Sequence, residues 1–488
     1  MRKVFIITEG GKNVGFGHLA RCVSLSQAFE ERSISPVFII NGDKSVCNIL
    51  GKRKYFIFDW LKEKKRLLET VRGSAICIVD SYMCDERFYK EISNNVDLAV
   101  YVDDNNRLKY DKGVVLNGSV YATTLNYAKD REISYLLGTN YTLIRREFWN
   151  MPNIKIKKAV NRVLVTFGGD DKRQMTPLIL NLLKNEYPQF RKLVVIGGGF
   201  RSIEKIDSLK DSKTKFIHNP SSEKMKRIMI RSDIAISAAG QTLYELARVG
   251  IPTIGVCVAK NQLKNAKGWE KAGFLEYAGR FNDGNLKKRV KRSIERFKSV
   301  KVRKQRSKIA KLLIGGSGSQ TAVKAILSQW FENNLSLRKA RIQDARDILN
   351  LFNERRVREG SFDPKIISWD HHLGWMKKRM KDKDCVLFII SVSNQFYGQI
   401  RFDIDKPKNE AAISFSLVKS ARGLNLSSYI LNIAVNTFFA ERPDINSINA
   451  YIREKNIPSI RAFKKAGFNF QKNIKINRYK TKFYARGK

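Results

Sequence analysis

Glycines, an imidazole and a guanidinium stand together in the stretch Gly15-Phe16-Gly17-His18-Leu19-Ala20-Arg21. The apolar run from Val4 to Thr8 precedes it and predicts a buried strand, and the apolar residues after it recur at helical spacing. A strand, a glycine loop and a helix start therefore follow one another. Glycines let a ligand approach the backbone, and the free N–H groups of a helix start favour an anion. Spacing alone leaves His18 open to two interpretations, a helix-capping imidazole or a group that faces the ligand.

Three loops further along the chain have the composition of phosphate-binding turns. They are Gly168-Gly169-Asp170-Asp171, Gly197-Gly198-Gly199 and the segment Ser237 to Glu245. In the last one a strand ends in small residues and a helix begins, which places amide donors at a phosphate. Glu245 then lies one turn inside the helix, where its carboxylate can accept both hydroxyls of a ribose. Each loop alone is a weak signal, because such turns are common in α/β folds.

Carboxylates also follow predicted strands. Asp80-Ser81-Tyr82 and Asp103-Asp104 fall at two strand ends, and ligands of parallel sheets bind at the carboxyl ends of the strands. The pairs Asp103-Asp104 and Asp170-Asp171 also suggest a metal. We expect none, because nothing else in the sequence supplies ligands.

The elements that position these residues alternate between short apolar runs and amphipathic segments, which predicts parallel βαβ units. A polar stretch from Asn150 to Lys158 separates two such halves, residues 1–150 and 159–332, and two sheets of one kind imply a cleft between them. The predicted strands are 4–8, 37–41, 55–58, 75–80, 98–103 and 114–117, then 162–167, 192–196, 215–217, 233–237 and 253–256.

A different pattern follows in a third domain, residues 335–488. It predicts an α+β arrangement with an antiparallel meander and an amphipathic helix after it. The predicted strands are 335–341, 386–391, 398–403 and 411–418, and the predicted helices are 344–356 and 424–439.

Composition narrows the class of protein. With 488 residues, 43% hydrophobic and 28% charged, the chain predicts a soluble protein of about three domains. The net charge of +46 is spread along the chain, and its densest run, Lys287 to Lys311, keeps an apolar helical stripe, so we expect no nucleic-acid binding. No apolar run approaches the roughly 18 residues of a membrane helix. Six scattered cysteines without CxxC spacing predict reduced thiols. We therefore expect a cytoplasmic protein without stable membrane insertion.

Taken together, the motifs of residues 1–330 are recognisable. They resemble, in order and spacing, the UDP-sugar hydrolases of pseudaminic acid biosynthesis, through Val14-Gly15-Phe16-Gly17-His18, Arg21-Cys22, Asp80-Ser81-Tyr82, Gly168-Gly169 with Asp171, Thr242 to Glu245, Gly250-Ile251-Pro252 and Asn261-Gln262. The resemblance implies a GT-B-like pair of Rossmann-type domains that hydrolyses UDP-2,4-diacetamido-2,4,6-trideoxy-β-L-altropyranose with inversion at the anomeric carbon. The chain departs from that pattern at Ala239, where a second glycine is usual, and at Lys260, where an acidic residue is common.

The same resemblance implies the site. It assigns catalysis to His18, Tyr82 and Asn261, and UDP-sugar binding to Gly15, Gly17, Arg21, Gly169, Asp171, Gly240, Thr242, Glu245 and Gln262. A neutral imidazole with a pKa of about 6.5 can take a proton from water at pH 7, so His18 is the candidate base.

Two motifs of the third domain resemble the GNAT acetyltransferases. Val418 with Arg422-Gly423-Leu424-Asn425-Leu426-Ser427 is similar to their pyrophosphate loop, and Asn456-Ile457-Pro458-Ser459 with Phe463 and Ala466-Gly467-Phe468 to their second motif. The resemblance implies acetyl-CoA as co-substrate, held by Val418, Arg422, Gly423, Asn425, Ser427, Asn456 and Ser459. It also implies acetylation of the 4-amino group of the UDP-sugar precursor, next to other enzymes of nonulosonic acid biosynthesis.

This third domain also departs from its family. Asn425 and Ser427 replace small residues, and Phe463 replaces a tyrosine that protonates the departing thiolate. The segment from Val357 to Trp375 resembles the substrate side of nucleotide-sugar N-acetyltransferases in this family. Without that resemblance, Trp375 is core packing and His372 is a surface helix residue.

Two other functions stay open at this point. A GT-B glycosyltransferase would move the sugar from UDP to a membrane or glycan acceptor. A nucleotide-sugar binding protein would hold the same ligand without catalysis.

Overall fold

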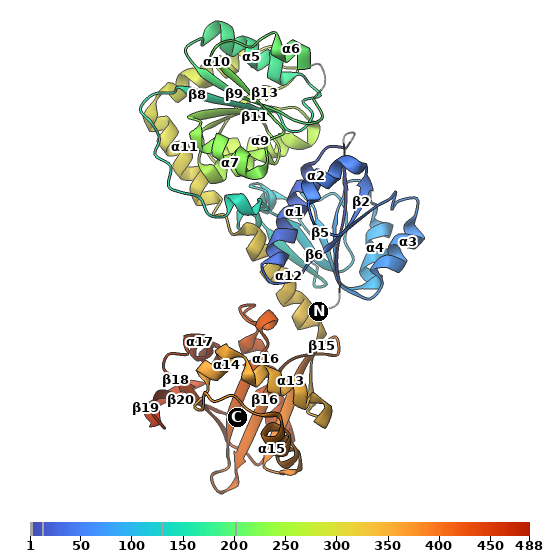
Figure 1. Cartoon of the computed structure of the whole chain (residues 1–488), viewed down its shortest axis with the longest axis vertical. Helices are drawn as coiled ribbons and strands as arrows, with labels where there is room; N and C mark the ends of the chain where they lie inside the picture. The colour runs from blue at the N-terminus through green and yellow to red at the C-terminus, as the bar shows by residue number, and fades with distance from the viewer. Residues whose placement is uncertain (1–2, 12–13, 129, 201–202) are drawn as a thin grey trace. The chain divides into compact units, whose positions relative to one another are not determined.

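The structure is a computed structural model that describes residues 3–11, 14–128, 130–200 and 203–488. It divides into two compact units, one that extends to Ile326 and one from Leu327 to Lys488. Figure 1 shows the whole chain. Within the described ranges, no helix is long and apolar enough to cross a membrane.

The first sheet has seven parallel strands in the order β3-β2-β1-β4-β5-β6-β7. Its central strands are buried on both faces, as parallel strands covered by helices must be. The strands are β1 (Val4–Gly10), β2 (Val37–Gly42), β3 (Tyr55–Ile57), β4 (Ser74–Asp80), β5 (Val96–Val102), β6 (Gly113–Asn117) and β7 (Ile133–Leu137). The helices are α1 (Gly17–Glu30), α2 (Cys47–Leu50), α3 (Lys64–Val71) and α4 (Glu86–Asn95).

The second sheet has six parallel strands in the order β10-β9-β8-β11-β12-β13. The strands are β8 (Arg162–Thr166), β9 (Arg191–Ile196), β10 (Thr214–His218), β11 (Ile234–Ala238), β12 (Thr253–Cys257) and β13 (Leu275–Arg280). The helices are α5 (Met175–Glu186), α6 (Ile203–Asp207), α7 (Ser222–Arg231), α8 (Thr242–Val249), α9 (Leu263–Lys271), α10 (Leu286–Lys298) and α11 (Val300–Leu313), and α12 (Gly318–Asn334) follows.

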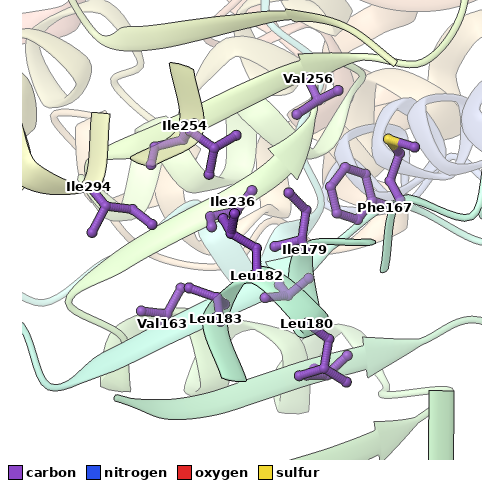
Figure 2. Packing of buried hydrophobic residues seen from close by; sticks show 14 of the residues in the cluster. Val163, Phe167, Ile179, Leu180, Leu182, Leu183, Ile236, Ile254, Val256 and Ile294 are labelled. Atoms are coloured by element: carbon purple, nitrogen blue, oxygen red, sulfur yellow. The ribbon is translucent and has the colours of Figure 1, made fainter. Parts of the chain in front are cut away.

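Apolar side chains in the core of the second sheet hold α5 against the strands. Figure 2 shows Ile179, Leu182 and Leu183 of α5 among side chains of the strands, such as Val163 and Ile236. Burying one such side chain stabilises the fold by about 1.5–3 kcal/mol. This packing fixes the ends of β8 and β11, from which the Gly168 and Gly240 loops emerge.

The last unit carries a seven-stranded mixed sheet in the order β14-β15-β16-β17-β18-β20-β19. Its strands are β14 (Leu335–Lys339), β15 (Cys385–Val392), β16 (Gln395–Asp405), β17 (Glu410–Leu417), β18 (Ser447–Arg453), β19 (Asn469–Ile476) and β20 (Tyr479–Gly487). Its helices are α13 (Ala345–Asn353), α14 (Arg355–Gly360), α15 (Trp369–Lys381), α16 (Ser427–Glu441) and α17 (Ile457–Lys465).

The fold class expected from the sequence is confirmed: two parallel Rossmann-type sheets are followed by a mixed α+β unit. Some elements differ from the expectation. Strands β7, β13 and β18 to β20 were not predicted, and the expected helix 344–356 is two helices, because Glu354 leaves the helical region with φ −57° and ψ 129°. The helix expected from residue 424 begins at Ser427.

Candidate active site

The loop after β1 places an imidazole at the start of α1, as the sequence predicts. His18 is the second residue of that helix. Gly15 has φ +94°, which a side chain would strain, and no atom of the described residues lies within 4 Å of a Cβ added at Gly15 or Gly17. The loop therefore leaves room beside the imidazole.

The imidazole of His18 is held by a carboxylate 62 residues away. Its Nδ1 lies 2.6 Å from Asp80 Oδ1, at the end of β4, and its side chain keeps 16% of its surface exposed. Because a carboxylate only accepts, Nδ1–H is the donor, so the neutral ring carries no proton on Nε2. Asp80 thus selects the tautomer in which Nε2 can act as a base.

Arg21, one turn further along α1, completes this network. Its Nε and Nη2 donate to Asp80 at 2.5 Å each, and its Nη1 donates to Asp104. Only 8% of Arg21 is exposed. The guanidinium therefore lies between two carboxylates, and its predicted contact with UDP stays a prediction.

Tyr82 lies against the other side of His18. The two rings meet edge to face at 4.6 Å, and the Tyr82 hydroxyl donates to Asp104 at 3.2 Å. The Tyr82 backbone N–H donates to Glu9 Oε1 at 2.9 Å, and that oxygen lies 4.0 Å from His18 Nε2. Four strand or helix ends therefore meet at one site.

Burial and charge set the protonation of this site. Burial lowers the pKa of His18, but the charge of Asp80 and its hydrogen bond outweigh it, so the His18 pKa is raised. Burial alone raises the pKa of Asp80, yet the charges of Arg21 and His18 hold it well below its usual range. Burial, then the charge of Asp104, raises the pKa of Tyr82. The ordinary His18 pKa assumed from the sequence is therefore wrong, and the ring is a stronger base than expected.

Glu245, the expected ribose ligand, is the fourth residue of α8 and is 6% exposed. Arg145 grips both of its oxygens, Nε to Oε1 and Nη2 to Oε2, at 2.7 Å each, and also donates to Ser222. Arg145 precedes the short helix Arg146–Phe148, on the chain that leaves the first sheet. No local pattern in the sequence singles out Arg145, since its partner is 100 residues away.

The loop after β8 differs in detail from the expectation. Asp171 has φ +35°, and its two carboxylate oxygens accept the N–H groups of Met175 and Thr176, the first two residues of α5. This carboxylate is a helix cap. Its predicted contact with UDP stays a prediction.

The remaining predicted residues of the second sheet lie on neighbouring loops. Thr242 begins α8, directly after Gly240, and a Cβ added at Gly240 would lie 3.3 Å from Gln262 Nε2. Gln262 Oε1 accepts Val258 N–H at 3.1 Å. Asn261 is exposed beside it in a short helix, Lys260–Gln262.

Contacts join these loops to the first sheet. The Tyr244 hydroxyl accepts Val120 N–H at 3.3 Å, and Lys264 Nζ lies 3.5 Å from Asn105 O, next to Asp104. A Cβ on Gly169 would lie 3.4 Å from the Phe16 ring, so this loop borders the His18 loop. Loops of the second sheet therefore contact loops of the first at Val120, Asn105 and Phe16.

A metal is not indicated in the part of the chain that the structure describes, where no three His, Cys, Asp or Glu side chains gather to hold one. Asp103, one of the candidate ligands, instead accepts N–H groups from Asn105 and Arg107 and the Tyr110 hydroxyl. Absence of a metal requirement stays a prediction.

In the last unit, two neighbouring strands are paired along only part of their length. β17 and β18 pair only from Glu410 to Ala412 against Ser447 to Asn449, although both strands continue. Val418 directly follows β17, which ends at Leu417, and the loop from Arg422 to Leu426 leads into α16, which begins at Ser427. The part of β17 beyond Ala412 therefore does not pair with β18, and the N-terminus of α16 follows at the end of the same loop.

Two residues of this loop adopt the conformation its sequence requires. Gly423 has φ +74° and Asn425 φ +63°, so asparagine keeps the left-handed turn. Arg422 donates to Leu417 O and to Glu354, both at 2.7 Å. Its guanidinium therefore holds the loop, and its contact with CoA stays a prediction.

The second motif caps α17. Asn456 Oδ1 accepts the N–H of Ser459 at 3.3 Å. Phe463, in place of the expected tyrosine, is 5% exposed and meets Phe468 edge to face at 4.9 Å. It packs as a core residue.

The environment of His372 differs from the surface position expected from the sequence. It is 1% exposed, stacked on Trp375 at 5.5 Å and against Phe352, so its assignment as a surface residue is wrong. Burial lowers its pKa. Trp375 packs with the core between α13 and α15, as expected without the resemblance.

Comparisons with protein families match two parts of the chain. Residues 162–322 match the glycosyltransferase family 28 C-terminal domain, and residues 334–469 match the acetyltransferase (GNAT) domain. A solved spermidine N-acetyltransferase from Vibrio cholerae, in complex with CoA and spermine, is 18% identical, with a TM-score of 0.29, over 32% of this chain and 95% of that one.

Relatives of the first part include three proteins. An uncharacterised protein, MJ1062, of Methanocaldococcus jannaschii is 24% identical, over 52% of this chain and 55% of that protein. The pseudaminic acid cytidylyltransferase and UDP-2,4-diacetamido-2,4,6-trideoxy-β-L-altropyranose hydrolase of Helicobacter pylori is 22% identical, over 54% and 46%. The corresponding hydrolase of Campylobacter jejuni is 21% identical, over 56% and 99%.

The matches cover about half the length of the first two relatives and nearly all of the third. They confirm the two resemblances inferred from the sequence, to the UDP-sugar hydrolases in the first part and to the GNAT acetyltransferases in the last.

Proposed function

We propose that the first two domains are an enzyme that hydrolyses UDP-2,4-diacetamido-2,4,6-trideoxy-β-L-altropyranose to UDP and the free sugar, with inversion. The observation that carries this is the Asp80–His18 pair, which leaves Nε2 as a base beside a loop that the Gly169 loop borders. The similarity to hydrolases of that sugar supports the choice of substrate.

In this mechanism, water attacks the anomeric carbon while His18 Nε2 takes its proton. Asp80 balances the imidazolium that forms, and general-base help of this kind is worth about 10² to 10⁴ in rate. The uridine ribose lies on Glu245, and amides of the Gly169 and Gly240 loops stabilise the diphosphate as it leaves.

The test is release of UDP from the UDP sugar in water, without an acceptor. Wild-type protein and His371→Asn, which alters an exposed imidazole of the other unit, should release UDP, and His18→Asn should lose at least 100-fold in kcat with UDP affinity kept. Anomeric proton NMR should show inversion.

The match to a glycosyltransferase domain favours a second candidate, transfer of the sugar to an acceptor. UDP release only after an acceptor is added would replace the hydrolase with this function. UDP binding without turnover under either condition would leave a binding protein.

We also propose that the GNAT domain acetylates the 4-amino group of the UDP-sugar precursor from acetyl-CoA. The splayed β17–β18 pair and the α16 start support CoA binding. Mass spectrometry of a reaction with acetyl-CoA and the 4-amino UDP sugar tests this, since acetylation adds one acetyl group and frees CoA. Partnership with other nonulosonic acid enzymes and a cytoplasmic location stay predictions.

A further inference from the structure

Glu9 is a buried carboxylate, and only one of its two oxygens takes part in the hydrogen-bond network around His18. It lies in β1 with 2% of its surface exposed. Oε1 accepts the Tyr82 N–H, but Oε2 is buried and has no hydrogen-bond partner among the described residues. A buried acceptor left unpaired costs roughly 1–3 kcal/mol, so stability alone does not explain a carboxylate at this point.

Glu9 turns its other oxygen toward His18, the oxygen that accepts the Tyr82 N–H and that keeps a second lone pair for another donor. Its Oε1 lies 4.0 Å from Nε2, the nitrogen that carries no proton in the neutral ring. This separation is too long for a direct hydrogen bond. A water oxygen at about 2.8 Å from each atom would subtend an angle of about 90°, close to the angle between the two O–H bonds of water.

We propose that Glu9 is a catalytic residue that holds the nucleophilic water together with His18. This inference rests on the proposed hydrolase function. The water donates one hydrogen bond to Nε2 and one to the Glu9 carboxylate, so both lone pairs of its oxygen stay free. One of them then faces the anomeric carbon.

The proposed hydrolysis step needs only water, the UDP sugar, His18 and Glu9. The water oxygen forms a bond to the anomeric carbon, and its proton moves to Nε2. The bond from that carbon to the diphosphate oxygen breaks, and its electron pair leaves with UDP. Glu9 keeps its hydrogen bond to the second proton and takes none, while its charge favours the imidazolium.

A purely structural Glu9 would need only an acceptor for the Tyr82 N–H. Glu9→Gln separates the two roles, because its carbonyl oxygen can still accept from Tyr82 while the side chain loses the negative charge that orients the water and favours the imidazolium. The matched control is Glu69→Gln, an exposed glutamate of α3 in the same domain.

The experiment measures kcat, KM and the pH profile of UDP release by the full-length protein. Glu9→Gln should lower kcat roughly 10- to 100-fold with KM within about twofold. The acid limb of its kcat profile should move to lower pH, because loss of the carboxylate charge lowers the pKa of His18. Glu69→Gln should match wild type.

Each outcome decides a different point. If Glu9→Gln keeps kcat within about threefold, or if its acid limb stays in place, the water-holding role is wrong, although hydrolysis itself stands. If wild type releases no UDP without an acceptor, the proposed function fails, and this inference with it. If Glu9→Gln does not fold, Glu9→Asp provides a second test, because it moves the carboxylate back by one methylene. An unchanged kcat for Glu9→Asp would also contradict the water-holding role.

Discussion

Asp80 is the residue on which the candidate site depends most. It has no exposed surface, and it binds both His18, the proposed base, and the only guanidinium that the described residues place on it, Arg21. Removing one partner of a buried ion pair leaves the other charge uncompensated, which costs more than the pair contributes.

Asp80→Asn should therefore destabilise the protein by about 3–5 kcal/mol and lower the His18 pKa. Denaturant unfolding measures the first effect and NMR titration of the imidazole the second. Asp111→Asn, an exposed carboxylate 3.9 Å from Lys90, is the control and should stay within about 0.5 kcal/mol of wild type. Equal unfolding free energies for the two variants would contradict the burial argument.

The raised pKa of His18 also predicts the pH dependence of catalysis. A general base acts only when unprotonated, so kcat should be flat at high pH and fall as pH drops through the His18 pKa. Because Asp80 raises that pKa, the half-maximal rate should lie above pH 6.5. A midpoint below this value in a kcat profile would show that another group is the base.

At the scale of elements, two turns hold the predicted loops in shape. The Asp171 carboxylate caps α5, so Asp171→Ala should cost roughly 0.5–2 kcal/mol. Asp170→Ala is the neighbouring control, since that carboxylate is 32% exposed and pairs only loosely with Lys172, at 3.5 Å. Thermal unfolding compares the two. A loss of UDP affinity without a loss of stability would instead favour direct contact with the ligand.

Asn425 is the corresponding test in the last unit. Asn425→Val forces a β-branched side chain into the left-handed region, at a cost of about 1–2 kcal/mol. CoA affinity, measured by calorimetry, should fall about 5- to 30-fold. Asn425→Gly accepts the same φ and should bind CoA at least as well as wild type. Equal affinity of both variants would mean that the loop does not hold CoA.

The sequence predicted most of the fully buried strands, but it also predicted the exposed edge strands β3 and β14 and missed the interior strand β18. Strands such as β1 and β4 are continuous apolar runs, whereas β7 and β13 lie at sheet edges with mixed burial. The break at Glu354 carries no glycine or proline. The site was predicted where one loop carries the chemistry, as at His18, but Asp80 and Arg145 reach partners 62 and 100 residues away, which no local pattern reveals.

On the scale of the whole molecule, the boundary of the last unit lies inside α12. Trp330 and Phe331 are buried, and both rings meet Tyr397 within this unit, while Ser328 donates to Leu424 O at 2.6 Å. The end of the helix is therefore part of the core of the GNAT fold.

A fragment of residues 327–488 should fold and bind CoA as the whole chain does, within about threefold in Kd. A fragment of residues 335–488 lacks both aromatic rings and should lose at least about 3 kcal/mol of unfolding free energy. Denaturant titration of the two fragments provides the comparison, and indistinguishable midpoints would contradict this packing.

The grip of Arg145 on Glu245 has one further consequence. The carboxylate expected to recognise a sugar hydroxyl is the same one that ties the chain leaving the first sheet to α8 of the second. A substitution at Arg145 would therefore have two effects: it would loosen the connection between the two sheets, and it would reorient the Glu245 carboxylate. Selectivity for ribose over deoxyribose would then report whether the contact between Arg145 and Glu245 is intact.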